Sequence, residues 1–184
     1  MAASFTFAES YGASSGADNA HISLLTTDAA SGADDTTAAN AAPVVIPASS
    51  YAYSFERWIR GHWSGTFTSI TALKMWRYAG TLAGSIKIKA LVKTSVATTY
   101  ASPITTTSTY AGTSGNEGTT TNDLAYAAST TAPGGALAPA FNAASLGTPA
   151  QTNSSDYIVM QLVVPSGSAS GNTTVGFRFG WSEV

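Results

Sequence analysis

The stretch from 51 to 93 holds most of the large side chains and most of the positive charge of this 184-residue chain. It contains three of the four tryptophans (Trp58, Trp63 and Trp76) and seven of the eight Lys and Arg residues, and no acidic residue occurs within 57–93. Ala, Thr, Ser and Gly account for 100 of the 184 residues, so the rest of the chain supplies few side chains that can fill a core. Because burial of large apolar side chains stabilises a fold, we expect this stretch to form much of the core.

The same stretch alternates with the period of two that is typical of β-strands. In SIKIKALVK at 85–93, the face predicted to be buried carries Ile86, Ile88, Ala90 and Val92. The opposite face carries a lysine row, which consists of Lys87, Lys89 and Lys93. Lysines in such a row either protect a sheet edge from unwanted pairing or bind a ligand, and we favour the first. Gly61 predicts a turn, and the AGTLAG segment at 79–84 predicts a second one.

Two further strands are predicted near the C-terminus. The DYIVMQLVV segment at 156–164 is apolar almost throughout, which predicts a strand buried on both faces. In the following TTVGFRFGW segment, the large residues Val175, Phe177, Phe179 and Trp181 alternate with Gly176, Arg178 and Gly180. Glycines opposite large rings predict that another ring or backbone packs closely against the bare face.

These strands together predict an all-β fold. No helical pattern is long enough to connect parallel strands, so we expect an antiparallel β-sandwich of jelly-roll or Greek-key type over residues 51–184. Residues 94–155 are rich in Ser, Thr, Ala and Gly and have few apolar anchors, which predicts a loop-rich insertion in that domain.

Residues 1–50 read as an extended N-terminal arm. Residues 1–56 carry six acidic side chains and no basic one, and most of 1–50 lacks apolar periodicity. Such a segment buries too little apolar area to offset its ordering entropy, so we expect contacts outside it to hold it in place. The acidic arm and the basic 57–93 stretch are complementary in charge, either within one chain or between neighbouring copies. The alternative is that the arm packs along its own domain.

The sequence contains few groups that support catalysis or metal binding. It has no cysteine, its two histidines are His21 and His62, and it lacks the nucleophile-elbow, zinc-protease, dinucleotide-binding and P-loop motifs. We therefore predict no enzyme activity, no catalytic or cofactor-binding residue, no metal site and no cofactor. The N-terminus has no basic segment followed by an apolar one, which predicts no signal peptide. No apolar run has the length of a membrane span, so no membrane association is expected.

Basic and aromatic residues interleave in the central stretch, and they are the candidate interaction residues. The set consists of Arg57, Trp58, Arg60, Trp63, Trp76 and Arg77, together with Lys87, Lys89 and Lys93. Three interpretations apply to the Trp and Arg members: packing in a core under Arg stems, stacking on single-stranded nucleic acid, or stacking on sugar rings. We favour core packing because the chain has few other large side chains. Nucleic-acid binding is the least expected of the three.

Three segments resemble parts of tailed-phage virion structural proteins, especially small β-sandwich decoration or fibre-type subunits. They are YSFERWIRGHWSGTF, SIKIKALVK and the terminal TTVGFRFGWSEV, and the Ser/Thr/Ala/Gly-rich arm and the absence of cysteine fit the same group. The resemblance implies a virion localisation and a non-enzymatic subunit of a capsid or tail surface. Its implied partners are copies of itself and other virion proteins. The alternative function is a carbohydrate-binding β-sandwich that uses exposed Trp residues to bind glycans.

Overall fold

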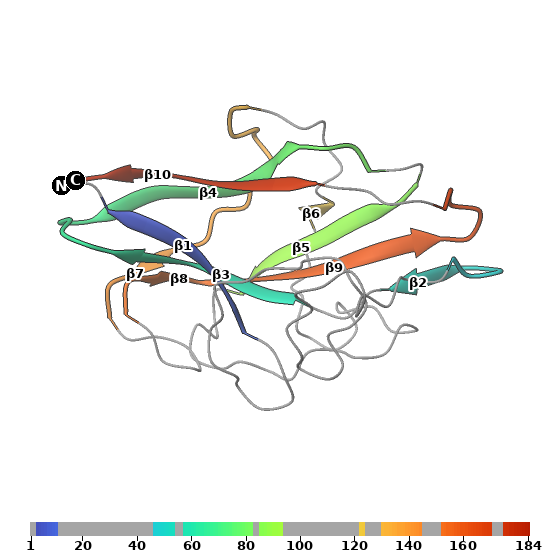
Figure 1. The fold of residues 1–184 in the computed structure, drawn as a ribbon, viewed down its shortest axis with the longest axis horizontal. Coiled ribbons are helices and arrows are strands. Elements are labelled where there is room, and N and C mark those ends of the chain that lie inside the picture. Colours follow the sequence, from blue (N-terminus) through green and yellow to red (C-terminus); the bar gives the residue numbers. More distant parts are fainter. Residues whose placement is uncertain are drawn as a thin grey trace.

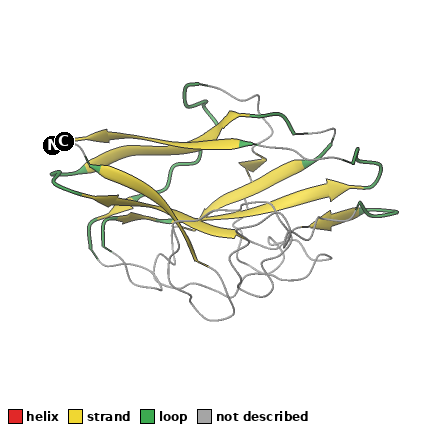
Figure 2. Cartoon of the chain, in the orientation of Figure 1, coloured by secondary structure: helices red, strands yellow, loops and turns green. Residues whose placement is uncertain are grey.

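The computed structural model of the chain describes residues 3–10, 46–53, 57–82, 85–93, 122–123, 130–144, 152–170 and 175–184. Every regular element in these segments is a β-strand, and all strand pairs are antiparallel (Figure 2). The predicted all-β, antiparallel class is therefore confirmed. The strands form a larger sheet of eight strands and a smaller sheet of two.

The larger sheet is built around β9 (Tyr157–Pro165), which is buried over nearly its whole length. On one side β9 pairs with β5 (Lys87–Lys93), with Lys87 opposite Val163. On its other side lie β2 (Tyr51–Tyr53) and β3 (Arg57–Ser64). The prediction of a strand buried on both faces is confirmed, and this strand joins two parts of the central stretch (Figure 1).

The outer strands of the larger sheet are shorter or come from distant parts of the chain. Strand β1 (Ser4–Ser10) pairs with β3 along its full length. Strand β6 (Asn122–Asp123) pairs with β5, and β8 (Ser154–Ser155) joins β3 to β7 (Phe141–Asn142). The predicted loop-rich insertion at 94–155 thus contributes three short strands to the sheet, and its other residues lie mostly outside the described segments.

The smaller sheet consists of β4 (Ile70–Ala79) and β10 (Gly176–Glu183). On the far side of β4, Leu137 exchanges two backbone hydrogen bonds with Met75. The register of the β4–β10 pair shifts between Gly180 and Ser182, where Ala72 has a positive φ of 52°. A β-bulge of this kind bends the strand locally.

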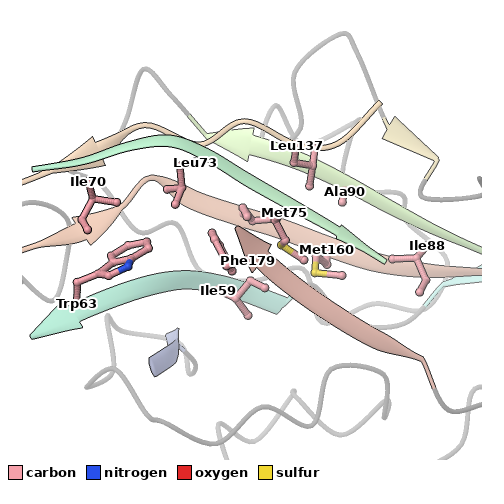
Figure 3. Close-up of a cluster of buried hydrophobic side chains, with 11 residues drawn as sticks. Ile59, Trp63, Ile70, Leu73, Met75, Ile88, Ala90, Leu137, Met160 and Phe179 are labelled. Carbon is pink, nitrogen blue, oxygen red and sulfur yellow. The ribbon is translucent and has the colours of Figure 1, made fainter. Parts of the chain in front are cut away.

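One hydrophobic core joins the two sheets (Figure 3). It consists of Ile59, Trp63, Ile70, Leu73, Met75, Ile88, Ala90, Leu137, Ile158, Met160 and Phe179. Ile88 and Ala90 are fully buried in it, as the alternation of 85–93 predicts. Most of these residues belong to the stretch from 51 to 93, and the others come from β9, from β10 and from Leu137.

Trp63 lies at the centre of an aromatic layer within this core. Its ring contacts those of Phe5, Phe141, Phe179 and Trp181, with centroid distances between 5.1 and 6.1 Å. Offset and edge-to-face pairs in this range stabilise a fold beyond the area that they bury. The layer therefore connects β1, β3, β7 and β10.

Gly61 does not form the predicted turn. It lies inside β3, and a side-chain carbon built on it would lie 2.6 Å from Trp63 and 2.8 Å from Phe5. Both rings occupy the space that the missing side chain leaves. The prediction is wrong because the glycine serves close ring packing within a strand and not a reversal of the chain.

The first part of the predicted arm is a strand of the larger sheet. Phe5 and Phe7 of β1 pack against the core, and Ala8 is buried. The backbone N–H of Ala3 lies 3.1 Å from both carboxylate oxygens of Glu183, so the two ends of the chain lie side by side (Figure 1). Over residues 3–10 the chain thus packs along its own domain, and residues 11–45 lie outside the described part.

The bare face of β10 is covered by rings, as predicted. A side-chain carbon on Gly180 would lie 3.0 Å from the Trp76 ring, and one on Gly176 would lie 2.6 Å from the Tyr78 ring. Both rings belong to β4, the neighbouring strand. Large residues on one strand therefore fill the space above glycines on the other.

Candidate interaction surfaces

The three tryptophans of the candidate set are inside the protein. Trp58 and Trp63 have no exposed surface, and Trp76 is 5% exposed. Trp63 belongs to the main core, whereas Trp58 forms a second buried cluster with Tyr157 and Val159. None of these three rings therefore presents an open face to a sugar or a nucleobase in this structure.

Two arginines of the set are also buried. The Arg60 guanidinium lies 4.7 Å from the centre of the Tyr157 ring, in a cation–π contact. Arg77 donates a hydrogen bond of 3.0 Å from Nη1 to the carbonyl of Gly80. Arg57 is placed by its backbone alone at the start of β3. Arg60, packed on the Tyr157 ring, has the arrangement that the core-packing interpretation predicts.

Lys87 and Lys89 line a cleft on the face of the larger sheet that points away from the main core. Lys93, the third member of the row, ends β5. We call this feature the tyrosine–lysine cleft, and its volume is about 390 Å³. Its lining residues are Tyr51, Tyr53, Ser85, Lys87, Lys89, Val163 and Pro165. The volume falls in the range of about 300–1,000 Å³ that is usual for small-molecule sites.

Strand pairing explains how this cleft forms. Val163 of β9 is the partner of Tyr53 on one side and of Lys87 on the other, so the three side chains lie in one row across the sheet. In the next row, Tyr51 lies opposite Pro165. Adjacent strands are about 4.8 Å apart, so about 10 Å separates the tyrosine wall from the lysine wall. The smaller side chains of β9 form the floor.

The two walls differ in chemistry. The Tyr51 and Tyr53 rings lie 6.4 Å apart at an angle of 33°, and Tyr51 is 55% exposed. On the facing wall, Lys87 is exposed and Lys89 is half-buried. Tyr53 and both lysines also interact with other groups of the protein. The cleft thus presents aromatic rings on one side and positive charge on the other.

Sequence reasoning identified the lysines of this cleft but not its tyrosines. The alternation in YAYSF places Tyr51 and Tyr53 on one face of a strand, and that signal is present in the sequence. It does not show that this strand lies one strand away from Lys87, because β9 lies between them and is distant in sequence.

A second surface is the edge of β10. Within the described residues only β4 pairs with β10, and we call the other side of β10, with which no described strand pairs, its open edge. Two observations fix which backbone groups point to that edge. Val184 exchanges backbone hydrogen bonds with Ser69, next to β4, and Met75 directs its N–H and C=O away from β10, to Leu137.

Backbone groups alternate in direction along an antiparallel strand. Arg178, which lies opposite Trp76, therefore directs its N–H and C=O to β4. Phe179 lies opposite Met75, so its N–H and C=O point to the open edge. Val184 directs its backbone groups toward Ser69, so the N–H and C=O of the preceding residue, Glu183, point to the open edge. These are the groups with which a further strand would pair.

Asp156 fastens the 130–144 segment to the larger sheet. Its carboxylate accepts a 3.0 Å hydrogen bond from the N–H of Ala140, and its own N–H donates a 2.9 Å bond to the Ala140 carbonyl. Burial raises the pKa of the Asp156 carboxyl above its ordinary value, and the hydrogen bond from Ala140 partly offsets this rise. This carboxyl holds two segments together.

Among the residues that the structure describes, no three His, Asp or Glu side chains gather as metal ligands would. These residues also include no helix of the length and apolarity needed to cross a bilayer. In comparisons with known proteins, no protein-family model, no curated protein and no solved structure matches the chain.

Proposed function

We propose that this chain is a non-enzymatic structural subunit of a virion, located on a capsid or tail surface, that assembles with copies of itself and with other virion proteins. Its two sheets form a β-sandwich of jelly-roll or Greek-key type. Assembly uses the open edge of β10 and the acidic segment that follows β1. The observation that carries the proposal is the open edge of β10, which a strand of a second copy extends.

The surroundings of this edge support pairing with a second copy. Phe177 and Trp181 of β10 are only half-buried, although both pack against the core. Phe5 and Phe7 of β1 are half-buried in the same layer, and the Phe5 ring lies 5.1 Å from that of Trp181. A subunit that pairs with β10 removes more of these rings from water, at about 25 cal/mol per Å² of apolar surface. A strand edge whose backbone N–H and C=O groups are unpaired is a ready template for the addition of a further strand.

Charge supports the same arrangement. Residues 1–56 carry six acidic and no basic side chains, and residues 57–93 carry seven basic and no acidic ones. Attraction between unlike regions of neighbouring copies sets their orientation and increases the rate of association. The net charge of −2 adds little repulsion between copies.

The edge is tested with two substitutions at Glu183. Glu183→Ala and Glu183→Pro both remove the carboxylate that accepts the N–H of Ala3. Only Glu183→Pro also removes a backbone N–H that points to the open edge. We expect the proline variant to assemble at least about tenfold more weakly than the alanine variant, by light scattering after size-exclusion chromatography. Equal assembly of the two variants contradicts a role for this edge.

The acidic segment is tested by charge removal. Replacing Asp18, Asp28, Asp34 and Asp35 by Asn leaves β1 intact and neutralises most of the acidic charge of residues 1–50. We expect weaker assembly at low salt and little difference from the unaltered chain at 1 M salt, where charges are screened. Electron microscopy of the unaltered assembly shows whether it is a regular ring or lattice, as a virion surface requires. Irregular aggregates contradict the virion proposal.

A further inference from the structure

We propose that the tyrosine–lysine cleft binds an acidic sugar, namely a pyranose unit that carries a carboxylate or sulfate group. The cleft lies on the face of the larger sheet that points away from the main core. The open edge of β10 belongs to the other sheet, so the binding of a sugar does not compete with pairing at β10. In Figure 1, β2 and the end of β9 lie at the opposite end from the termini.

The tyrosine wall provides the apolar part of the recognition. A pyranose ring has faces of C–H groups, and these pack against aromatic rings such as that of Tyr51. Tyr51 is 55% exposed, and no other large aromatic side chain of the described residues is exposed to that extent. Tyrosine also carries a hydroxyl that donates and accepts hydrogen bonds with sugar hydroxyls. An exposed ring beside a second ring at 6.4 Å is therefore suited to a sugar.

The lysine wall provides the charge. Lys87 and Lys89 project from the same face of β5, and the Lys87 row includes Tyr53. Hydrogen bonds from an ammonium to a carboxylate or sulfate are roughly twice as strong as neutral ones. With about 10 Å between the walls, one ring-sized unit contacts a tyrosine and a lysine at once. This arrangement selects an anionic sugar over a neutral one.

The geometry favours a sugar over single-stranded nucleic acid. Proteins that bind such strands have a basic groove that follows several phosphates and a series of rings for successive bases. Here two lysines lie on one wall of a single cleft, and three of the arginines of the chain do not extend this wall: Arg60 and Arg77 are buried, and Arg178 lies over the Tyr78 ring on the smaller sheet. The cleft thus has the size of one unit and not of a chain of phosphates.

The test is calorimetric titration of the full chain with tetragalacturonic acid, with neutral maltotetraose as the matched probe. We expect the acidic probe to bind and the neutral one to bind at least about tenfold more weakly. Tyr51→Ala and Lys87→Gln each lower the affinity for the acidic probe by about tenfold or more. Lys74→Gln, at an exposed lysine of the smaller sheet, leaves it unchanged. Both cleft residues are exposed, so unfolding midpoints should match that of the unaltered chain.

Three results overturn the proposal. The first is that the chain binds neither probe. The second is that the acidic probe binds with an affinity that Tyr51→Ala and Lys87→Gln do not change. The third is that an oligothymidylate binds more tightly than tetragalacturonic acid and loses affinity in the same two variants, which assigns the cleft to nucleic acid. None of these results depends on whether the chain assembles through β10.

Discussion

The rings of Phe5 and Trp63 lie 5.1 Å apart, and both occupy the space beside the α-carbon of Gly61. Phe5 belongs to β1, and Trp63 and Gly61 belong to β3, the strand with which β1 pairs. The pair thus connects the N-terminal strand to the aromatic layer between the sheets. Packing at this position accounts for Trp63, one of the three tryptophans of the central stretch.

Replacing Gly61 by alanine should destabilise the fold. The added carbon would lie 2.6 Å from Trp63 and 2.8 Å from Phe5, so at least one ring must move within a packed core. We expect a loss of about 1–3 kcal/mol in the free energy of unfolding, measured with urea. Gly134→Ala is the matched control, because no atom lies within 4 Å of a carbon added there. Equal effects of the two changes argue against close ring packing at Gly61.

Removing the Phe5 ring should lower the free energy of unfolding by more than the same change would in an exposed N-terminal arm. Phe5 contacts Phe7, Trp63, Phe179 and Trp181, so Phe5→Ala leaves a cavity among four rings. We expect a loss of about 3 kcal/mol in the free energy of unfolding. Thr6→Ala, at an exposed position of the same strand, is the control and should change stability by less than about 0.5 kcal/mol. An unfolding curve of Phe5→Ala that coincides with that of the unaltered chain contradicts the placement of β1 in the core.

Asp156 should make stability depend on pH. Its pKa is raised from 3.8 by burial, so the folded state holds its proton more tightly than the unfolded state does. The contribution of Asp156 to stability is therefore full below about pH 3.8 and is lost as pH rises through the raised pKa. The variant Asp156→Asn keeps an oxygen that accepts the N–H of Ala140 and carries no charge.

Two variants at this position separate charge from hydrogen bonding. The stability of Asp156→Asn relative to the unaltered chain should increase between pH 4 and pH 8, measured by urea unfolding at each pH. Asp156→Ala loses the acceptor and should be less stable than Asp156→Asn by about 1 kcal/mol at every pH. A difference between Asp156→Asn and the unaltered chain that does not vary with pH contradicts the raised pKa.

Patterns local to one strand predicted their elements well. The alternation in 85–93 placed Ile88 and Ala90 in the core, and the glycines of β10 indicated the rings that cover them. These features depend on which residues share a face of one strand, and a period of two is enough to show that. The buried strand at 156–164 was recognised from its almost continuous apolar run.

Features that depend on pairing between distant strands were not predictable. Gly61 was expected in a turn because glycine is common in turns. Its role in ring packing could not be predicted, because its ring partner Phe5 comes from a strand near the N-terminus. The tyrosine–lysine cleft combines β2, β5 and β9, and no local pattern shows that these strands are neighbours. The burial of Arg60 and Arg77 likewise follows from the packing of sheets and not from their own sequence neighbourhood.

Hydrogen exchange at the amides of β10 tests the proposed assembly most directly. The N–H of Phe179 points to the open edge, whereas that of Arg178 points to β4. Pairing with a second copy predicts that the Phe179 amide exchanges quickly in dilute solution and at least tenfold more slowly in concentrated solution, while the Arg178 amide is slow in both. A Phe179 amide that exchanges equally fast at both concentrations contradicts assembly through this edge.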